Sequence, residues 1–195
     1  MIILIDNGHG YNTSGKCSPD KSFYEWKKNR ELARDIVIEL KDDGYDARLI
    51  VDDEYDISLS ERVQRVNDIC KKYGVSNVML VSIHSNAAGA DGKWHSARGF
   101  SAHVSLNASD KSKRLAKFLW QRSIEYGLKG NRCVPPEMYI AQNLYILRKT
   151  ICPAVLTENL FYDNKEDLEM LQSQQGHDKI VLAHLRAIRD YLKSL

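Results

Sequence analysis

Polar residues that could bind a metal ion or transfer a proton follow three short apolar segments of this sequence. The apolar segments are residues 2–5, 78–83 and 154–157. The polar residues that follow them are Asp6-Asn7-Gly8-His9-Gly10, His84-Ser85-Asn86 and Glu158-Asn159. Short apolar runs are typical of strands buried on both faces of a parallel sheet. Ligands of open α/β sheets bind at the carboxyl ends of such strands, so we expect these polar groups to meet at one edge.

Two histidines and one glutamate among the polar residues could together bind zinc. His9 lies between two glycines, which permit a tight turn and leave space around the imidazole, and His84 ends the most apolar segment. Glu25 lies at the start of a predicted helix, where the helix dipole favours a carboxylate. Each residue also has a purely structural explanation: a packed turn histidine, a buried histidine bonded to a backbone carbonyl, and a dipole-stabilised glutamate. Together they would form a set of three ligands that leaves the fourth position of one zinc ion open, as in catalytic sites.

Glu158 is a carboxylate at the end of an apolar strand, where burial of a charge is costly unless the group has a partner or a function. Near a zinc ion it could accept a proton from water and later pass it to a leaving amine. Burial would raise its pKa and a nearby cation would lower it. The alternative is a surface salt bridge, for which Arg148 is a candidate partner.

The remaining histidines carry weaker signals. His95 lies in the loop after His84 and could touch a substrate. His103 alternates with apolar residues in a predicted strand, so we expect it to face solvent. His177 and His184 lie in the last predicted helix, where a structural role is the simpler interpretation.

The four cysteines do not form a metal-binding pattern. Cys17, Cys70, Cys133 and Cys152 are far apart in the sequence, and no C-x-x-C pair occurs. This spacing argues against a zinc-cysteine cluster. Cys70 lies on the apolar face of a predicted helix and is expected in the core.

Predicted strands and helices alternate along the chain. Strands are expected over residues 2–5, 46–51, 78–83, 100–104, 144–147 and 154–157, the fourth of them exposed on one side. Helices are expected over residues 25–43, 59–73, 109–126 and 177–192, with a loop over 129–143. This alternation predicts an α/β fold: a three-layer sandwich with a mostly parallel, roughly six-stranded mixed sheet and helices on both faces. We expect residues 1–195 to form a single catalytic domain.

Composition and charge argue against several classes of protein. A net charge of +2 is too small to indicate a nucleic-acid partner. No apolar run approaches the roughly 18–20 residues that cross a membrane, so we expect no membrane insertion. Residues 1–6 lack the basic start and cleavage site of a signal peptide. We therefore expect either cytoplasmic synthesis with holin-type release or a leader that is not part of this chain.

Four groups of residues keep a fixed order from residue 2 to about residue 171. They are Ile5-Asp6-Asn7-Gly8-His9-Gly10 with Glu25, Ser60-Glu61-Arg62-Val63 with Asn67, Val81-Ser82-Ile83-His84-Ser85-Asn86-Ala87 with Arg98-Gly99-Phe100, and residues 144–148 with Cys152-Pro153-Ala154-Val155-Leu156-Thr157-Glu158-Asn159 and Asn164. In these motifs and in their order, the chain resembles the zinc-dependent N-acetylmuramoyl-L-alanine amidases of the amidase type 3 family. It departs from that pattern at Asn7, where the family often has proline, and in the longer segment 129–143.

The resemblance implies that His9, Glu25 and His84 bind one zinc ion and that Glu158 is the catalytic acid and base. It also implies a peptidoglycan substrate, cleaved at the amide bond between the lactyl group of N-acetylmuramic acid and the first L-alanine of the stem peptide. We expect Asn86 to bind this substrate, together with Arg148. The protein would then be a monomeric hydrolase that acts on the cell wall or in the periplasm, as an endolysin-like or an autolysin-type enzyme.

Two other functions fit some of the same residues. A zinc peptidase acting on non-wall peptides would need the same metal chemistry. A catalytically inactive peptidoglycan-binding module descended from an amidase would be indicated by a missing ligand or a missing Glu158, and all four residues are present.

Overall fold

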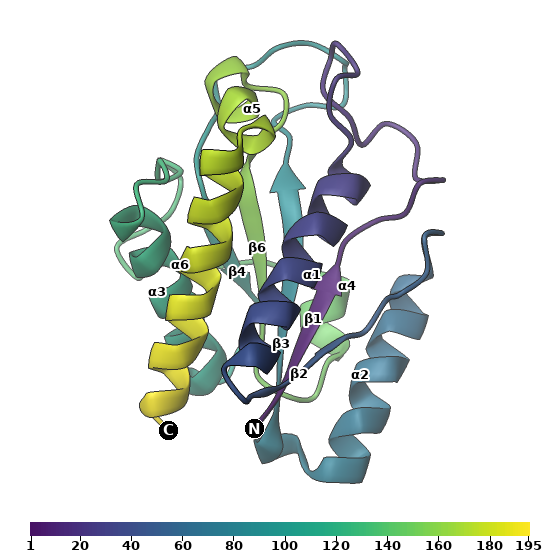
Figure 1. Cartoon of the computed structure of the whole chain (residues 1–195), viewed down its shortest axis with the longest axis vertical. Helices are drawn as coiled ribbons and strands as arrows, with labels where there is room; N and C mark the ends of the chain where they lie inside the picture. The colour runs from purple at the N-terminus through teal and green to yellow at the C-terminus, as the bar shows by residue number, and fades with distance from the viewer.

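The computed structural model describes residues 1–195 and contains one six-stranded sheet (Figure 1). The strands are β1 (Ile2–Asn7), β2 (Asp46–Leu49), β3 (Val78–Asn86), β4 (Ser101–Val104), β5 (Ile140–Ala141) and β6 (Ala154–Phe161). Their order across the sheet is β2-β1-β3-β6-β4-β5. Neighbouring strands are parallel except for β4 and β6, which are antiparallel. The mostly parallel mixed sheet predicted from the sequence is confirmed.

Helices cover both faces of this sheet and complete three layers. They are α1 (Glu25–Asp42), α2 (Leu59–Tyr73), α3 (Asp110–Glu125), α4 (Tyr145–Lys149), α5 (Lys165–Gln172) and α6 (Gln174–Lys193), with a short 3-10 helix η1 (Val75–Asn77). The larger core cluster joins α1, α3 and α6 to one face, and the smaller cluster joins α2 and α4 to the other. None of the helices combines the length and apolar composition that a membrane crossing requires.

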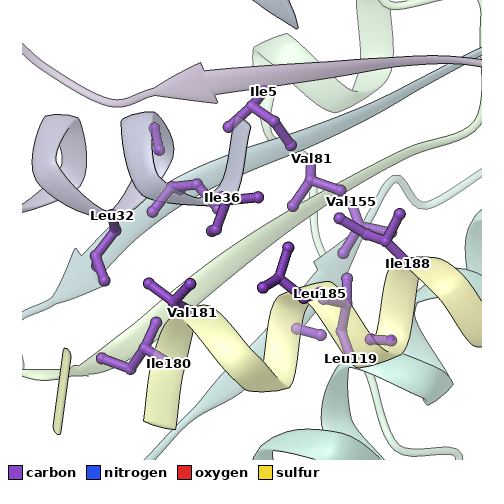
Figure 2. Packing of buried hydrophobic residues seen from close by; sticks show 14 of the residues in the cluster. Ile5, Leu32, Ile36, Val81, Leu119, Val155, Ile180, Val181, Leu185 and Ile188 are labelled. Carbon is purple, nitrogen blue, oxygen red and sulfur yellow. The ribbon is translucent and has the colours of Figure 1, made fainter. Parts of the chain in front are cut away.

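Strand alternation decides which side chains reach the core and which reach the carboxyl edge. On the face covered by α1, α3 and α6, Ile5, Val81 and Val155 belong to one core cluster with Ile36, Leu185 and Ile188 (Figure 2). Successive side chains of a strand point to opposite faces. The alternate positions therefore face α2 and α4.

On that second face each strand changes from apolar to polar toward its carboxyl end. β1 changes from Leu4 to Asp6, β3 from Leu80 to His84, and β6 from Leu156 to Glu158. Because these three strands are parallel neighbours, the polar positions lie at the same edge.

The prediction of a strand over residues 144–147 was wrong. The segment begins helix α4, and its two buried apolar residues, Ile146 and Leu147, pack beneath α2 in the smaller core cluster. A four-residue apolar run shows too little periodicity to distinguish a buried strand from one turn of helix. Tertiary packing decided the outcome here.

The prediction that the strand over residues 100–104 is exposed on one side was also wrong. All four residues of β4 are buried, including His103, which was expected to face solvent and is only 7% exposed. One reason lies in β5, which pairs with β4 through His103 and Ile140 and brings the Gln142 side chain beside the His103 ring. That strand falls within the segment predicted to be a loop and covers the edge of β4.

Candidate metal centre and active-site cleft

His9, Glu25 and His84 meet at the carboxyl edge of the sheet. His9 follows β1, His84 lies near the end of β3, and Glu25 is the first residue of α1. Nε2 of His9 lies 3.4 Å from Oε2 of Glu25, and Nδ1 of His84 lies 3.2 Å from Oε1 of the same carboxylate. One ligand atom from each of the three residues falls within 4.8 Å of the others. The ligand set predicted from the sequence is thus one spatial cluster.

The spacing and chemistry of this cluster fit a zinc ion. Two ligands at about 2.0–2.1 Å in a tetrahedral arrangement are about 3.3 Å apart, close to the two measured separations. Glu25 is only 1% exposed, and no lysine or arginine pairs with its carboxylate. A buried carboxylate between two imidazoles is stabilised when a cation binds among them.

The pKa shifts of His9 and Glu25 favour the forms that bind a metal ion, whereas that of His84 favours the protonated ring, from which a bound metal ion would displace the proton. Burial lowers the pKa of His9 to about 4, although the charge of Glu25 acts in the opposite direction. Burial also acts on His84 and Glu25, but their hydrogen bond and opposite charges outweigh it. The pKa of His84 is therefore raised and that of Glu25 is lowered. A neutral imidazole and an ionised carboxylate are the forms that bind a metal ion.

Hydrogen bonds from neighbouring residues hold the Glu25 carboxylate in place. The backbone N–H of Ser85 donates to Oε1 at 3.1 Å, and Nδ2 of Asn29 donates to the same oxygen at 3.4 Å. Asn29 also donates to the carbonyl of Gly8 at 3.2 Å, which connects α1 to the turn that carries His9. Such outer contacts orient the groups that bind a metal ion directly.

Two buried arginines fix the turn around His9. His9 has φ of 66°, a conformation that non-glycine residues rarely adopt, and its carbonyl accepts a hydrogen bond from Nη1 of Arg30 at 2.8 Å. Arg62 donates from Nη1 to the carbonyl of Asn7 at 2.7 Å and to the carboxylate of Asp6 at 2.6 Å. These contacts stabilise the strained backbone that aims the imidazole at Glu25.

Gly8 lies too close to His84 to tolerate a side chain. A Cβ at this position would lie 2.0 Å from Cε1 of the His84 ring. We expect Gly8→Ala to displace the ring and to raise the Kd for zinc about 10- to 100-fold, as measured by competition with a fluorescent chelator.

Gly89→Ala is the matched control for this change. Its Cβ would lie 2.6 Å from Nε2 of His95, a histidine on an exposed loop that can move away. Zinc affinity should be unchanged in this variant. Equal affinity of Gly8→Ala and the unmodified protein would show that the His84 ring does not bind the ion in the observed position.

A cleft of about 850 Å³ opens over the candidate metal centre. His9, His84 and Glu158 line one part of it, and Ile57, Leu59, Leu144 and Ile146 supply apolar surface in another. A ligand bound here would meet both metal-binding groups and apolar contacts. This combination is typical of a substrate site.

Glu158 lies beside the three candidate ligands without belonging to their cluster. It pairs with His84 across β3 and β6, so the two side chains share one face of the sheet. Its Oε2 atom is buried and has no hydrogen-bond partner. Burial raises the pKa of Glu158 to about 7, with His84 opposing the shift and Glu25 adding to it. Glu158 forms no salt bridge with Arg148, which lines a separate cavity, so the alternative considered for Glu158 is not what the structure shows.

The two residues expected to bind substrate occupy different places. Asn86 lines the cleft next to His84, and its Oδ1 accepts a hydrogen bond from the backbone N–H of Ala87 at 2.8 Å. Arg148 is exposed on α4 and lines a separate cavity. Its guanidinium lies 5.6 Å from the ring centroid of Tyr145, which does line the cleft.

The other histidines divide into surface, structural and cleft residues. His95 pairs with Asp91 at 2.9 Å on an exposed loop and does not line the cleft. His177 pairs with Asp35, and the buried His184 contacts the hydroxyl of Thr157 at 3.0 Å. Both have the structural role expected of them.

His103 lines the cleft, and sequence reasoning missed it. Its Nε2 lies 3.0 Å from the hydroxyl of Ser101, which faces Glu158 across the β4–β6 pair. Alternation placed His103 correctly on the face opposite Ala102. The error was to assign that face to solvent, since nothing in residues 100–104 indicates that β5 and the cleft cover it.

Buried neutral histidines predict how stability depends on pH. Burial lowers the pKa of His103 and of His184 to about 4. In the unfolded chain both titrate near 6.5, so between pH 6.5 and 4 the unfolded state binds more protons and the free energy of unfolding falls as pH falls. We expect His103→Gln or His184→Gln to make this dependence shallower by up to about 1.4 kcal/mol per pH unit.

Denaturant titrations of metal-free protein from pH 4.5 to 7.5 would measure the pH dependence of stability, with His95→Gln on a surface loop as the control. An unchanged slope in both buried variants would contradict the assignment.

The cysteines form no disulfide. All four are free, and Cys70 is fully buried in the core as predicted.

The chain matches the model of the family described as N-acetylmuramoyl-L-alanine amidase over residues 3–190. It is 26% identical to the endolysin of Bacillus phage SPP1, over 98% of this chain and 66% of that protein. It is 24% identical to N-acetylmuramoyl-L-alanine amidase CwlM of Bacillus licheniformis, over 95% of this chain and 66% of that protein. The chain spans about two thirds of the length of these curated relatives.

Solved structures share the fold over nearly the whole chain. The N-acetylmuramoyl-L-alanine amidase from Clostridium difficile 630 superimposes with a TM-score of 0.82 at 26% identity, covering 99% of this chain and 97% of that one. The amidase Ami1 of Mycobacterium smegmatis has the same fold, with a TM-score of 0.85 at 18% identity over 100% of this chain and 98% of its own. With the family match over residues 3–190, the conclusion is that this chain belongs to the N-acetylmuramoyl-L-alanine amidase family.

Proposed function

We propose that this protein hydrolyses peptidoglycan at the amide bond between the lactyl group of N-acetylmuramic acid and the first L-alanine, with one zinc ion held by His9, Glu25 and His84. The observation that carries the proposal is the cluster of three ligand groups with Glu158 beside it in one cleft. Membership of the amidase family supports this choice of bond. The relatives named an endolysin and an N-acetylmuramoyl-L-alanine amidase support action at the cell wall.

The protein's own groups would position the substrate and move the proton. Zinc, when bound, supplies a Lewis acid that polarises a carbonyl and makes water more acidic. The Glu158 carboxylate lines the cleft beside the candidate ligands, where it accepts a proton from the attacking water. It then donates this proton to the nitrogen of the departing alanine, since an amide nitrogen leaves poorly unless it is protonated.

Asn86 and Arg148 are proposed to contact different parts of the substrate, Asn86 close to the reacting bond and Arg148 farther from it. The Asn86 side-chain oxygen is already bonded to Ala87, so its amide N–H groups remain to donate to a substrate carbonyl beside the metal centre. Arg148 lies outside the cleft, with its guanidinium 5.6 Å from the ring centroid of Tyr145, which lines the cleft. Its charge suits a carboxylate of the stem peptide that extends past the cleft.

We also propose that residues 1–195 form one catalytic domain that acts as a monomer. The single sheet and the family match over residues 3–190 support one domain. Both a phage lysin and a bacterial wall amidase are compatible with the relatives.

The discriminating experiment compares a muropeptide with the same stem peptide lacking its sugar. Mass spectrometry of the products should show cleavage of the muropeptide alone, with a new lactyl carboxylate and a new alanine amino terminus. Cleavage within the free peptide would instead support a zinc peptidase. Binding of the muropeptide without cleavage would support the inactive binding module.

A further inference from the structure

Three aromatic side chains form a cluster next to two loops that line the cleft, and we call this cluster the aromatic ledge: Tyr11, Trp26 and Tyr55. The rings of Tyr11 and Tyr55 are 4.5 Å apart, and those of Tyr11 and Trp26 are 6.4 Å apart. Tyr11 is 46% exposed and Tyr55 is 60% exposed. Large aromatic surface left open to solvent in one place is typical of a binding site.

Hydrogen bonds join the two loops that carry the tyrosines of the ledge. The N–H of Tyr11 donates to the carbonyl of Glu54 at 3.0 Å, and the N–H of Asp56 donates to Oδ1 of Asn12 at 2.7 Å. The hydroxyl of Thr13 donates to the Asp56 carboxylate at 2.6 Å. The two loops are therefore joined on both sides of the tyrosine pair.

Arg30 anchors the third ring to the turn of the metal centre. Its guanidinium lies 5.5 Å from the ring centroid of Trp26 and donates to the carbonyls of His9 and Asp53. This contact covers one side of Trp26, so Tyr11 and Tyr55 supply the open surface. A ligand would meet a preformed platform that loses little conformational freedom on binding.

The loops that carry the two tyrosines adjoin the cleft over the candidate metal centre. Asn12, Thr13 and Asp56, the chain neighbours of the two tyrosines, line the same cleft as His9 and Glu158. Tyr11 is two residues from His9, a separation of at most about 7 Å between α-carbons. A polymer whose side branch reacts at the metal centre would extend over these rings.

The charge around the ledge favours a neutral ligand over an acidic one. Asp52, Asp53 and Glu54 precede Tyr55 and are all exposed, and of the three only Asp53 has an ion-pair partner, Arg65. Acidic residues at this position disfavour the carboxylates of a stem peptide. A sugar ring has no charge, presents flat C–H faces to an aromatic ring, and carries hydroxyl groups at its edge that suit a phenol.

We propose that the aromatic ledge binds the glycan strand of peptidoglycan by stacking neutral N-acetylated sugar rings on Tyr11 and Tyr55. This inference rests on the proposed function and deepens it, because it assigns the glycan to the loops that adjoin the cleft. The protein would then prefer substrates with a glycan chain over a single muramoyl peptide.

The test compares two substrates in kinetics with the zinc-loaded protein. One is a glycan strand of several disaccharides carrying stem peptides, and the other is a single N-acetylmuramoyl peptide. In Tyr11→Ala and in Tyr55→Ala, the ratio of kcat/KM for the long substrate over that for the short one should fall about tenfold, through KM. Tyr73→Ala is the matched control, since this exposed tyrosine contacts Arg48 away from the cleft. An unchanged ratio, or an equal loss on both substrates, would overturn the proposal.

A binding measurement keeps this inference separate from the proposed function. Calorimetric titration with a hexamer of N-acetylglucosamine should show binding to the unmodified protein that is about tenfold weaker in either tyrosine variant. If the unmodified protein cleaves neither substrate, the proposed function fails. The titration would still show whether the aromatic ledge binds sugars. The proposal would be overturned if the unmodified protein did not bind the hexamer, or if it bound the hexamer with the same affinity as the two tyrosine variants.

Discussion

Replacing Glu158 by glutamine is expected to lower kcat about 10²- to 10⁴-fold while one zinc ion per chain stays bound. The substitution keeps the shape of the side chain and removes its ability to take and return a proton. Glu158 lies across the strand pair from His84 and is not among the clustered ligand groups, so the metal centre should keep its structure. Muropeptide turnover and metal analysis of the same preparation would measure both effects.

Glu166→Gln is the matched control for the loss of a carboxylate. Glu166 is exposed on α5 and pairs with Arg98 outside the cleft. Its turnover should equal that of the unmodified protein. Turnover by Glu158→Gln at the unmodified rate would contradict its role in proton transfer, and loss of the zinc ion from that variant would instead make Glu158 a ligand.

Replacing Arg62 by leucine is expected to cost about 3–5 kcal/mol of stability, because it leaves a buried charge without its partner. Asp6 is 1% exposed and bonds to Nη1 of Arg62 at 2.6 Å. Arg62 also donates to the carbonyl of Asn7 and to Asp56, so its removal should loosen the turn that carries His9. Denaturant unfolding would give the stability change, and zinc titration would report weaker binding.

Arg65→Leu is the control on the same helix. Arg65 forms its ion pairs with Asp53 and Glu61 at the surface, where such pairs contribute about 0–1 kcal/mol. A stability loss in Arg62→Leu no greater than that in Arg65→Leu would show that the buried pair with Asp6 contributes little.

The layered fold and the ligand cluster could be predicted because they depend on patterns along single segments. Apolar runs identified β1, β3 and β6, and parallel pairing then required His84 and Glu158 to share one edge. Ser58 caps α2 by accepting from the N–H of Glu61, as the spacing of these residues predicts.

The features that could not be predicted depend on contacts between distant segments. The helical conformation of α4 lets both Ile146 and Leu147 pack against α2. The surroundings of His103 come from β5, which pairs with β4, and from the cleft that His103 lines. The aromatic ledge joins Tyr11 to Tyr55 across two loops, so no periodicity connects them. The network around Asp6, Arg62 and Asp56 likewise spans β1 and α2.

Metal reconstitution combined with product analysis tests the central claim most directly. Protein stripped with a chelator should release no peptide from purified peptidoglycan. One equivalent of zinc should restore the release, with alanine as the new amino terminus, and His84→Ala should bind no zinc and remain inactive. Full activity in the metal-free protein, or restored activity in His84→Ala at one equivalent of zinc, would contradict the account.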